Sequence, residues 1–244
     1  MRSIFEYLKD TIANLYEVDQ SQLKYRFKQK YSDYYSRVTH TIDPKHDILV
    51  VSICTKTKDT DAKRKKMPAK DVYLGRANQI LSDTLPNLPV DWVILSGGYG
   101  LIQANTKINY YQDAIAELSK EELHNMSDYL KYQQDLEKIL EKGHYKMILF
   151  TISDRWMCTL NFEELQKAAG ENCKFITFMS QDRMNQDDFP KPSNHTNIIY
   201  KDEYFKAFGS PSISLKEKIV ADYLKYIQDH KDVDIKEFIR RVVK

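Results

Sequence analysis

Short apolar runs alternate with amphipathic stretches along the middle of this chain, and this alternation constrains the fold more than any other feature. Strands that are apolar on both faces belong to sheets covered on both faces. Alternation of strand and helix favours right-handed crossovers between parallel strands. The sequence therefore predicts an α/β fold, with a mostly parallel central sheet of about five strands covered by helices on both faces. The expected strands span 46–54, 91–97, 145–153, 174–180 and 196–200, and the helices between them span 68–85, 119–142 and 161–170.

Helical patterns also occupy both ends of the chain. Residues 1–40 carry apolar positions at three- and four-residue spacing, which predicts an N-terminal helical extension. Two further helices are expected at 214–230 and 234–243, so that residues 41–244 form the α/β domain. The polar, proline-bearing stretch 181–195 is the expected long loop.

Composition narrows the setting in which the chain works. A net charge of +2 over 244 residues singles out neither a nucleic-acid nor a membrane partner. Cys54, Cys158 and Cys173 are too widely spaced for a CxxC zinc site, and the six histidines show no metal-ligand spacing. No apolar run approaches the roughly 18 residues of a membrane span, and the N-terminus is a poor signal peptide. We therefore expect a cytoplasmic protein in a reducing compartment, without a membrane partner or a bound metal.

Polar residues follow four of the predicted strands. In an open parallel sheet, ligands bind outside the carboxyl ends of the strands. The four endings cover residues 54–58, 96–100, 153–155 and 180–183, and three of them carry a cation. This pattern favours a polar, anionic ligand, although loops are polar in any case.

The second ending, Ser96-Gly97-Gly98-Tyr99-Gly100, places three glycines within four positions. It has neither the spacing of a dinucleotide fingerprint nor the Gly-Lys-Ser/Thr of a P-loop, so the sequence predicts no bound cofactor. It is not a nucleophile elbow, in which glycines flank a serine. Its glycines serve either a tight turn or a cradle of backbone N–H groups for a phosphate or carboxylate.

Cys54 lies at the first strand end, close to Lys56 and Lys58. An exposed thiol beside two cations has a lowered pKa and is reactive. A buried thiol is the commoner state of cysteine, and it is inert. Both interpretations are open at the level of the sequence.

Two basic segments are candidates for contact with a nucleic-acid backbone. Residues 56–70 carry seven basic residues against two acidic ones, and they read as a mobile loop beside the expected site or as an ordinary solvated loop. Residues 21–38 interleave basic and aromatic side chains, which suits a stacking surface for bases or a solvated amphipathic helix. The candidate contacts are Lys24, Arg26, Lys28, Lys30, Lys63, Arg64, Lys65 and Lys66.

Residues 48–115 combine several motifs in one order. They are Cys54-x-x-x-Lys58, Pro68-Ala69-x-x-x-Tyr73, Trp92-x-x-Leu95-Ser96-x-x-Tyr99-Gly100-Leu101 and Tyr110-x-x-Asp113. This stretch resembles the YaaA-like superfamily and is more distantly similar to the core of archaeosine synthase, an enzyme that modifies a tRNA base. It departs from the latter's Cys-x-x-x-Lys-Pro-Tyr-x-x-Ser motif, because Gly75 replaces the serine and a basic insert separates the lysine from the tyrosine.

The resemblance implies an enzyme directed at a nucleobase or nucleotide, free or in DNA or RNA. Lys58 would hold an anion or attack as an amine, and Asp113 would recognise a ribose hydroxyl or accept a proton. The alternatives are a non-catalytic nucleic-acid-binding stress or defence protein, and a module that senses a small molecule. The resemblance assigns Cys54, Lys58, Tyr73 and Asp113 to catalysis, and it assigns Ser96, Gly97, Gly98, Tyr99, Gly100 and Tyr110 to substrate binding.

Overall fold

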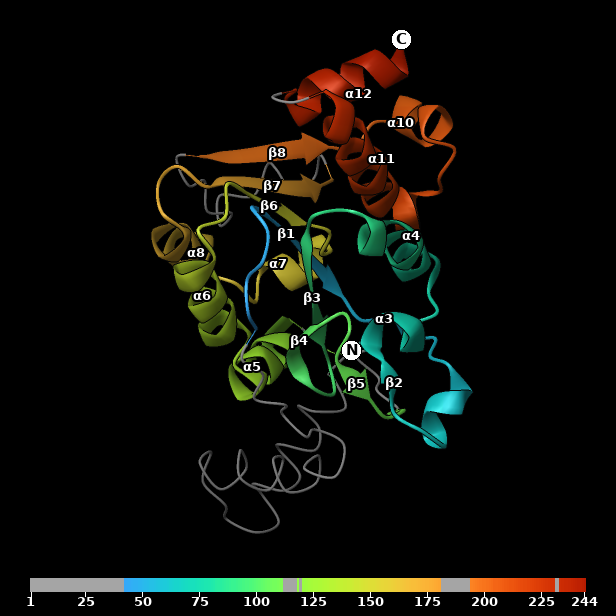
Figure 1. Cartoon of the computed structure of the whole chain (residues 1–244), viewed down its shortest axis with the longest axis vertical. Coiled ribbons are helices and arrows are strands. Elements are labelled where there is room, and N and C mark those ends of the chain that lie inside the picture. The colour runs from blue at the N-terminus through green and yellow to red at the C-terminus, as the bar shows by residue number, and fades with distance from the viewer. Residues whose placement is uncertain (1–41, 112–117, 119, 181–193, 231–232) are drawn as a thin grey trace.

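A six-stranded sheet forms the centre of the protein (Figure 1). The computed structural model describes residues 42–111, 118, 120–180, 194–230 and 233–244, so the expected N-terminal helical extension lies outside the described residues. The strand order is β4-β3-β1-β6-β7-β8. Five strands run parallel, which confirms the predicted sheet, and β4 is an antiparallel edge strand that the sequence analysis missed. The bounds are Ile48–Ile53 for β1, Asp91–Ser96 for β3, Gly100–Gln103 for β4, Met147–Phe150 for β6, Lys174–Met179 for β7 and His195–Ile199 for β8.

The order of the strands places a topological switch point beside β1. The chain begins the sheet at β1, adds β3 on one side, and then returns to add β6 on the other side. Val50 of β1 pairs with Trp92 on one side and with Leu149 on the other. Ligands of open α/β sheets bind near such a reversal, outside the carboxyl ends of the strands. The fold therefore directs attention to the residues that follow β1, β3 and β6.

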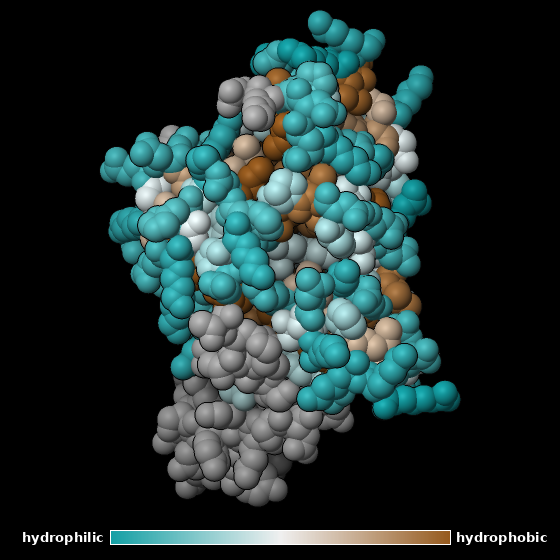
Figure 2. All heavy atoms as spheres, viewed as in Figure 1, coloured by the Kyte–Doolittle hydropathy of each residue, from teal (hydrophilic) through white to brown (hydrophobic). Residues whose placement is uncertain are grey.

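Helices cover both faces of the sheet, as predicted. In Figure 1, α6 (Tyr132–Gly143) and α8 (Phe162–Ala169) lie on one side, and α4 (Arg76–Thr84) and α11 (Leu215–Asp229) lie on the other. Leu49, Val50 and Val51 of β1 are fully buried between these layers. The face shown in Figure 2 is mainly hydrophilic, and apolar residues show mostly toward the middle of the molecule.

Two long helices predicted from periodicity are each broken into two. The stretch 68–85 divides into α3 (Ala69–Val72) and α4, because Tyr73 adopts an extended backbone and Gly75 packs closely on Thr55. The stretch 119–142 divides into α5 (Lys120–Leu130) and α6 at Lys131, whose φ of 56° is left-handed. Periodicity reports which positions are buried, and it does not report a single residue that leaves the helical backbone.

The basic segment 56–70, predicted to be a mobile loop, contains ordered elements. The 3-10 helix η1 (Thr60–Lys63) is capped by Asp59, whose carboxylate accepts from the N–H of Asp61. The segment continues into β2 (Met67–Pro68), which pairs antiparallel with β5 (Lys107–Ile108). The remaining elements are η2 (Leu85–Asn87), α7 (Asp154–Met157), α10 (Asp202–Ala207), η4 (Ser212–Ser214) and α12 (Ile235–Val243). No helix within the described ranges is long and apolar enough to cross a membrane.

The junction between α3 and α4 depends on the side chain of Asn78. Its Nδ2 donates to the carbonyl oxygens of Lys70 in α3 at 3.0 Å and of Tyr73, the residue that follows α3, at 2.8 Å. We expect Asn78→Ala to lower the free energy of unfolding by about 1–3 kcal/mol, because it removes the donor from buried carbonyl groups. Urea denaturation should show no comparable loss for Gln79→Ala, an exposed neighbour on the same helix. Equal midpoints for the two variants would contradict this role of Asn78.

Candidate functional site

The residues that follow β1 and β3 lie together at the carboxyl edge of the sheet. The backbone N–H of Cys54 donates to the carbonyl oxygen of Leu95 at 3.0 Å, which extends the pairing of the two strands. The Cys54 Sγ accepts from the N–H of Gly97 at 3.4 Å. Cys54 is buried, so the exposure that a reactive thiol requires is not met here.

Three hydroxyl groups meet behind this strand end. Tyr73 donates to Ser96 Oγ at 2.8 Å, Ser96 Oγ lies 3.1 Å from the Tyr111 hydroxyl, and the two phenol oxygens are 3.0 Å apart. All three residues are buried, and buried hydroxyl groups need such partners. Because each hydroxyl can donate one bond and accept another, they form a closed arrangement, which we call the hydroxyl ring (Tyr73, Ser96 and Tyr111).

Lys58 lies against the hydroxyl ring. Its Nζ is 4.4 Å from the centroid of the Tyr111 ring and 6.0 Å from that of Tyr73. A β-bridge between Lys58 and Tyr73 holds the two backbones side by side. Only 7 % of Lys58 is exposed, whereas lysine is almost never so buried without a specific partner. The sequence-predicted residues Cys54, Lys58, Tyr73 and Ser96 are thus brought into one cluster.

The glycine turn after β3 makes room for the hydroxyl ring. A Cβ on Gly98 would lie 2.6 Å from Cδ2 of the Tyr111 ring, and Gly100 has a left-handed φ of 78°. The N–H groups of Gly98 and Tyr99 point at Ser96 Oγ, at 3.3 and 3.1 Å. The turn therefore orients Ser96, and the predicted cradle for an anionic ligand stays a prediction.

Two further tyrosines frame the hydroxyl ring. The Tyr99 hydroxyl donates to the carbonyl oxygen of Asn109 and accepts from its N–H, at 3.2 and 3.1 Å. Burial raises the pKa of Tyr99 above its ordinary value, although the hydrogen bond to Asn109 opposes this, so the phenol is neutral at physiological pH. Tyr132 of α6 donates to the carbonyl oxygen of Ser96 at 2.8 Å. Tyr132 is not among the predicted site residues, because α6 reaches this site from a distant part of the chain.

The other predicted site residues have different positions. Tyr110, assigned to substrate binding, has the Lys63 amino group 4.6 Å from its ring centroid, and its neighbour Tyr111 enters the cluster instead. Asp113 lies outside the described residues, as do Lys24, Arg26, Lys28 and Lys30. The basic residues Lys63, Arg64, Lys65 and Lys66 are all exposed around η1.

A second polar group lies at the carboxyl ends of β6, β7 and β8. Asp154, which begins α7, accepts from the hydroxyl of Ser180 at 2.9 Å. Glu217 of α11 is 3 % exposed, and its Oε2 has no hydrogen-bond partner among the described residues. Burial raises the pKa of Glu217 to about 7, although Lys216 opposes the shift. Burial and the negative charges of Glu217 and Asp154 raise the pKa of Tyr200, so these three residues are electrostatically linked.

The sequence contains a signal for Glu217. Val220, Ala221 and Leu224 lie three, four and seven positions further along α11, and all are buried. Glu217 therefore occupies the apolar stripe of an amphipathic helix. A carboxylate in that position is unusual, and it marks a residue with a perturbed environment.

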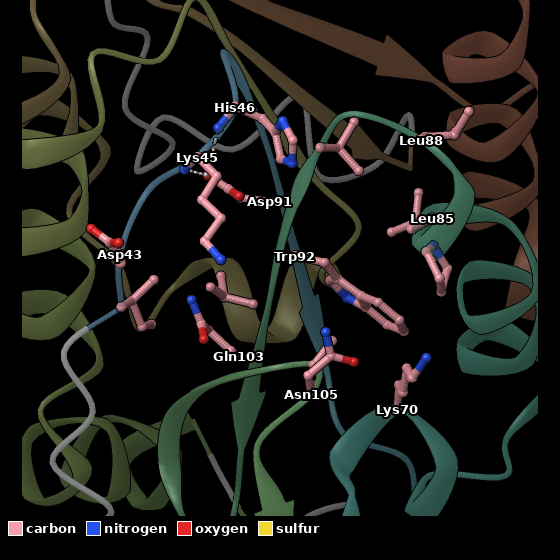
Figure 3. A pocket seen from close by; sticks show the side chains of 15 residues that line it. Asp43, Lys45, His46, Lys70, Leu85, Leu88, Asp91, Trp92, Gln103 and Asn105 are labelled. Atoms are coloured by element: carbon pink, nitrogen blue, oxygen red, sulfur yellow. Dashed lines mark hydrogen bonds between the residues drawn. The ribbon is translucent and has the colours of Figure 1, made fainter.

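A pocket of about 240 Å³ lies away from both groups, toward the amino end of β3 (Figure 3). Its walls come from the chain before β1, from η2, from β3, and from the end of β4 with Lys70 of α3.

Among the residues that the structure describes, no three His, Cys, Asp or Glu side chains are arranged to hold a metal ion. Comparison of the chain with protein-family models, with curated proteins and with solved structures found no match.

Proposed function

We propose that this chain is an enzyme directed at a nucleobase or nucleotide, free or within DNA or RNA, and that Lys58 and the hydroxyl ring carry its chemistry. The observation that supports this most is the burial of the Lys58 amine against Tyr111 at the carboxyl edge of the sheet. Buried lysine is costly, and enzymes use it as a nucleophile or as a point charge that holds an anion.

The hydroxyl ring supplies a fixed hydrogen-bonding group beside that amine. Tyr73, Ser96 and Tyr111 hold one another's hydroxyl groups in place, so a hydroxyl that turned from its neighbour to a substrate atom would donate a hydrogen bond from a defined position. Such a substrate atom would meet both this donor and the cation of Lys58.

The resemblance to the YaaA-like superfamily supports the nucleotide class of substrate, because its motifs fall on the clustered residues Cys54, Lys58, Tyr73, Ser96 and Tyr99. The basic surface around η1 supports a substrate with a phosphate backbone. These two observations are independent of one another, since one concerns buried residues and the other concerns exposed ones.

The proposal is tested by incubating the protein with single-stranded DNA, duplex DNA, tRNA and free nucleotides. The products are digested to nucleosides and searched by mass spectrometry for a changed or released base. We expect Lys58→Met to reduce turnover at least about 100-fold. The matched control is Lys142→Met, an exposed lysine at the end of α6, which should leave turnover unchanged.

Two results would contradict this function. The first is full turnover by the Lys58→Met variant, which would remove Lys58 from the chemistry. The second is the absence of any changed base with every substrate, provided that circular dichroism shows the protein to be folded.

A second candidate function is nucleic-acid binding without turnover. It is favoured by the exposure of Lys56, Lys63, Arg64, Lys65 and Lys66 within eleven positions. Under this alternative, the affinity for nucleic acid falls steeply as the salt concentration rises. Replacing Lys65 and Lys66 together by glutamine removes up to two phosphate contacts, so the slope of log affinity against log salt concentration becomes shallower by nearly two. Fluorescence anisotropy at several salt concentrations measures this binding, and the search for changed bases separates the two functions, because a pure binding protein binds with this salt dependence and changes no base.

A further inference from the structure

The pocket near the amino end of β3 is separate from the hydroxyl ring. It is lined by Asp91, Trp92 and Val93 at the start of β3, whereas Ser96 ends that strand. Val93 is the lining residue of β3 nearest to Ser96, and at a rise of about 3.3 Å per residue the two are about 10 Å apart along the strand. A ligand in this pocket would therefore not touch the hydroxyl ring.

One wall of the pocket is apolar. It is lined by Leu85 and Leu88 of the η2 region, by Val90 and by Trp92. Figure 3 shows Leu85, Leu88 and Trp92 on the same side. The Trp92 ring is held in place, because its Nε1 donates to Ser52 Oγ at 2.8 Å. A fixed indole beside aliphatic side chains forms a flat surface that suits a planar ring.

Polar side chains line the rest of the pocket, and two of them are amines. They are Lys45, Lys70, Gln103 and Asn105. In Figure 3, Lys45 and Gln103 lie on the side away from Leu85, whereas Lys70 lies below Trp92. Within the described part of the chain, no hydrogen bond or ion pair involves the side chains of Lys45, Lys70 or Gln103. Their donors are therefore available to a ligand, and Figure 3 shows the Lys45 amino group reaching toward the middle of the pocket.

The acidic residues of the pocket do not neutralise these amines directly. The Oδ2 of Asp91 accepts from the Lys45 N–H at 2.9 Å, from the His46 N–H at 3.3 Å and from the Tyr145 hydroxyl at 2.9 Å. That carboxylate therefore fixes the backbone before β1 as a wall of the pocket. Asp43, the other acid, is exposed and lies at the rim in Figure 3.

We propose that this pocket binds a small organic anion built on one planar ring system. The ring would lie along Trp92 and the leucines, and its acidic group would meet the amine of Lys45 or Lys70. The amides of Gln103 and Asn105 would bond polar atoms at the ring edge. Because about 240 Å³ is less than the usual range of roughly 300–1,000 Å³ for drug-sized ligands, the ligand has one planar ring system and not two. A nucleoside monophosphate and an aromatic carboxylate both present this chemistry.

Isothermal titration calorimetry with four probes tests the proposal. Adenosine monophosphate and indole-3-acetate represent the two sources of a ring-bearing anion, and adenosine and inorganic phosphate each lack one half of it. We expect at least one ring-bearing anion to bind at least tenfold more tightly than adenosine and phosphate. Replacing both lysines, as Lys45→Met with Lys70→Met, should weaken that binding at least tenfold. Lys107→Met, an exposed lysine outside the pocket, should leave it unchanged.

The outcomes separate this inference from the proposed function. Failure of both ring-bearing anions to bind at millimolar concentration overturns the inference, as does binding that the paired lysine replacement leaves unchanged. If Lys58→Met abolishes the binding of adenosine monophosphate and the paired replacement does not, the nucleotide occupies the hydroxyl ring. That result would overturn the pocket as its site and would support the proposed function.

Discussion

Replacing Gly98 by alanine is expected to lower the free energy of unfolding by about 3 kcal/mol, because overpacking of a rigid core costs roughly this much. The new Cβ would lie 2.6–2.8 Å from three carbons of the Tyr111 ring. Tyr111 cannot move aside freely, since its hydroxyl is bonded to Tyr73 and Ser96. The substitution should therefore displace Tyr111 from the hydroxyl ring as well as destabilise the fold.

Urea denaturation measures the loss, and two variants isolate its cause. Gly209→Ala is the matched control, because Gly209 has a left-handed φ of 58° but nothing within 4 Å of an added Cβ. It should cost only the backbone strain, about 1 kcal/mol. In a Tyr111→Ala background, Gly98→Ala should be nearly neutral. If Gly98→Ala lowers the free energy of unfolding as much in that background as in the wild type, the Tyr111 side chain is not the group for which Gly98 makes room.

Glu217 is expected to make the stability of the protein fall as the pH rises from about 5 to about 8. Burial raises its pKa from 4.5 to about 7, so over this interval the folded protein binds more protons than the unfolded chain. Stability must then decrease with increasing pH until the carboxyl group is ionised in both states. At about 1.4 kcal/mol per pKa unit, the shift corresponds to a loss of about 3 kcal/mol.

Thermal or urea unfolding of Glu217→Gln across the same pH range tests this expectation. The variant should lack the decrease and should be more stable than the wild type above about pH 7, because a buried amide never ionises. Glu141→Gln on α6 is the control, since that side chain is exposed. A difference between Glu217→Gln and the wild type that stays constant with pH would show that Glu217 does not titrate in this interval.

The residues of the hydroxyl ring illustrate how far sequence reasoning reached. Apolar runs followed by polar residues located the strand ends, and the open-sheet rule placed Cys54 and Gly97 at one edge, where they are in contact. Tyr73 and Ser96 are residues that the resemblance predicts for the site, and they are hydrogen-bonded to one another. Tyr111 was missed by one position, because no pattern in the sequence tells which of two adjacent tyrosines turns toward the interior.

The features that sequence reasoning did not locate depend on segments that are distant in the chain. The pocket joins residues before β1 to η2 and to the end of β4. Glu217 and Asp154 come from distant parts of the chain, and both raise the pKa of Tyr200. The sequence by itself determined the α/β class and the parallel strands, because the burial pattern of each element is encoded locally in its periodicity. Only the tertiary structure decided the strand order, the breaks at Tyr73 and Lys131, and the partners of Lys58 and Glu217. Those contacts depend on how the elements pack against one another, and the pattern within a single element does not contain that information.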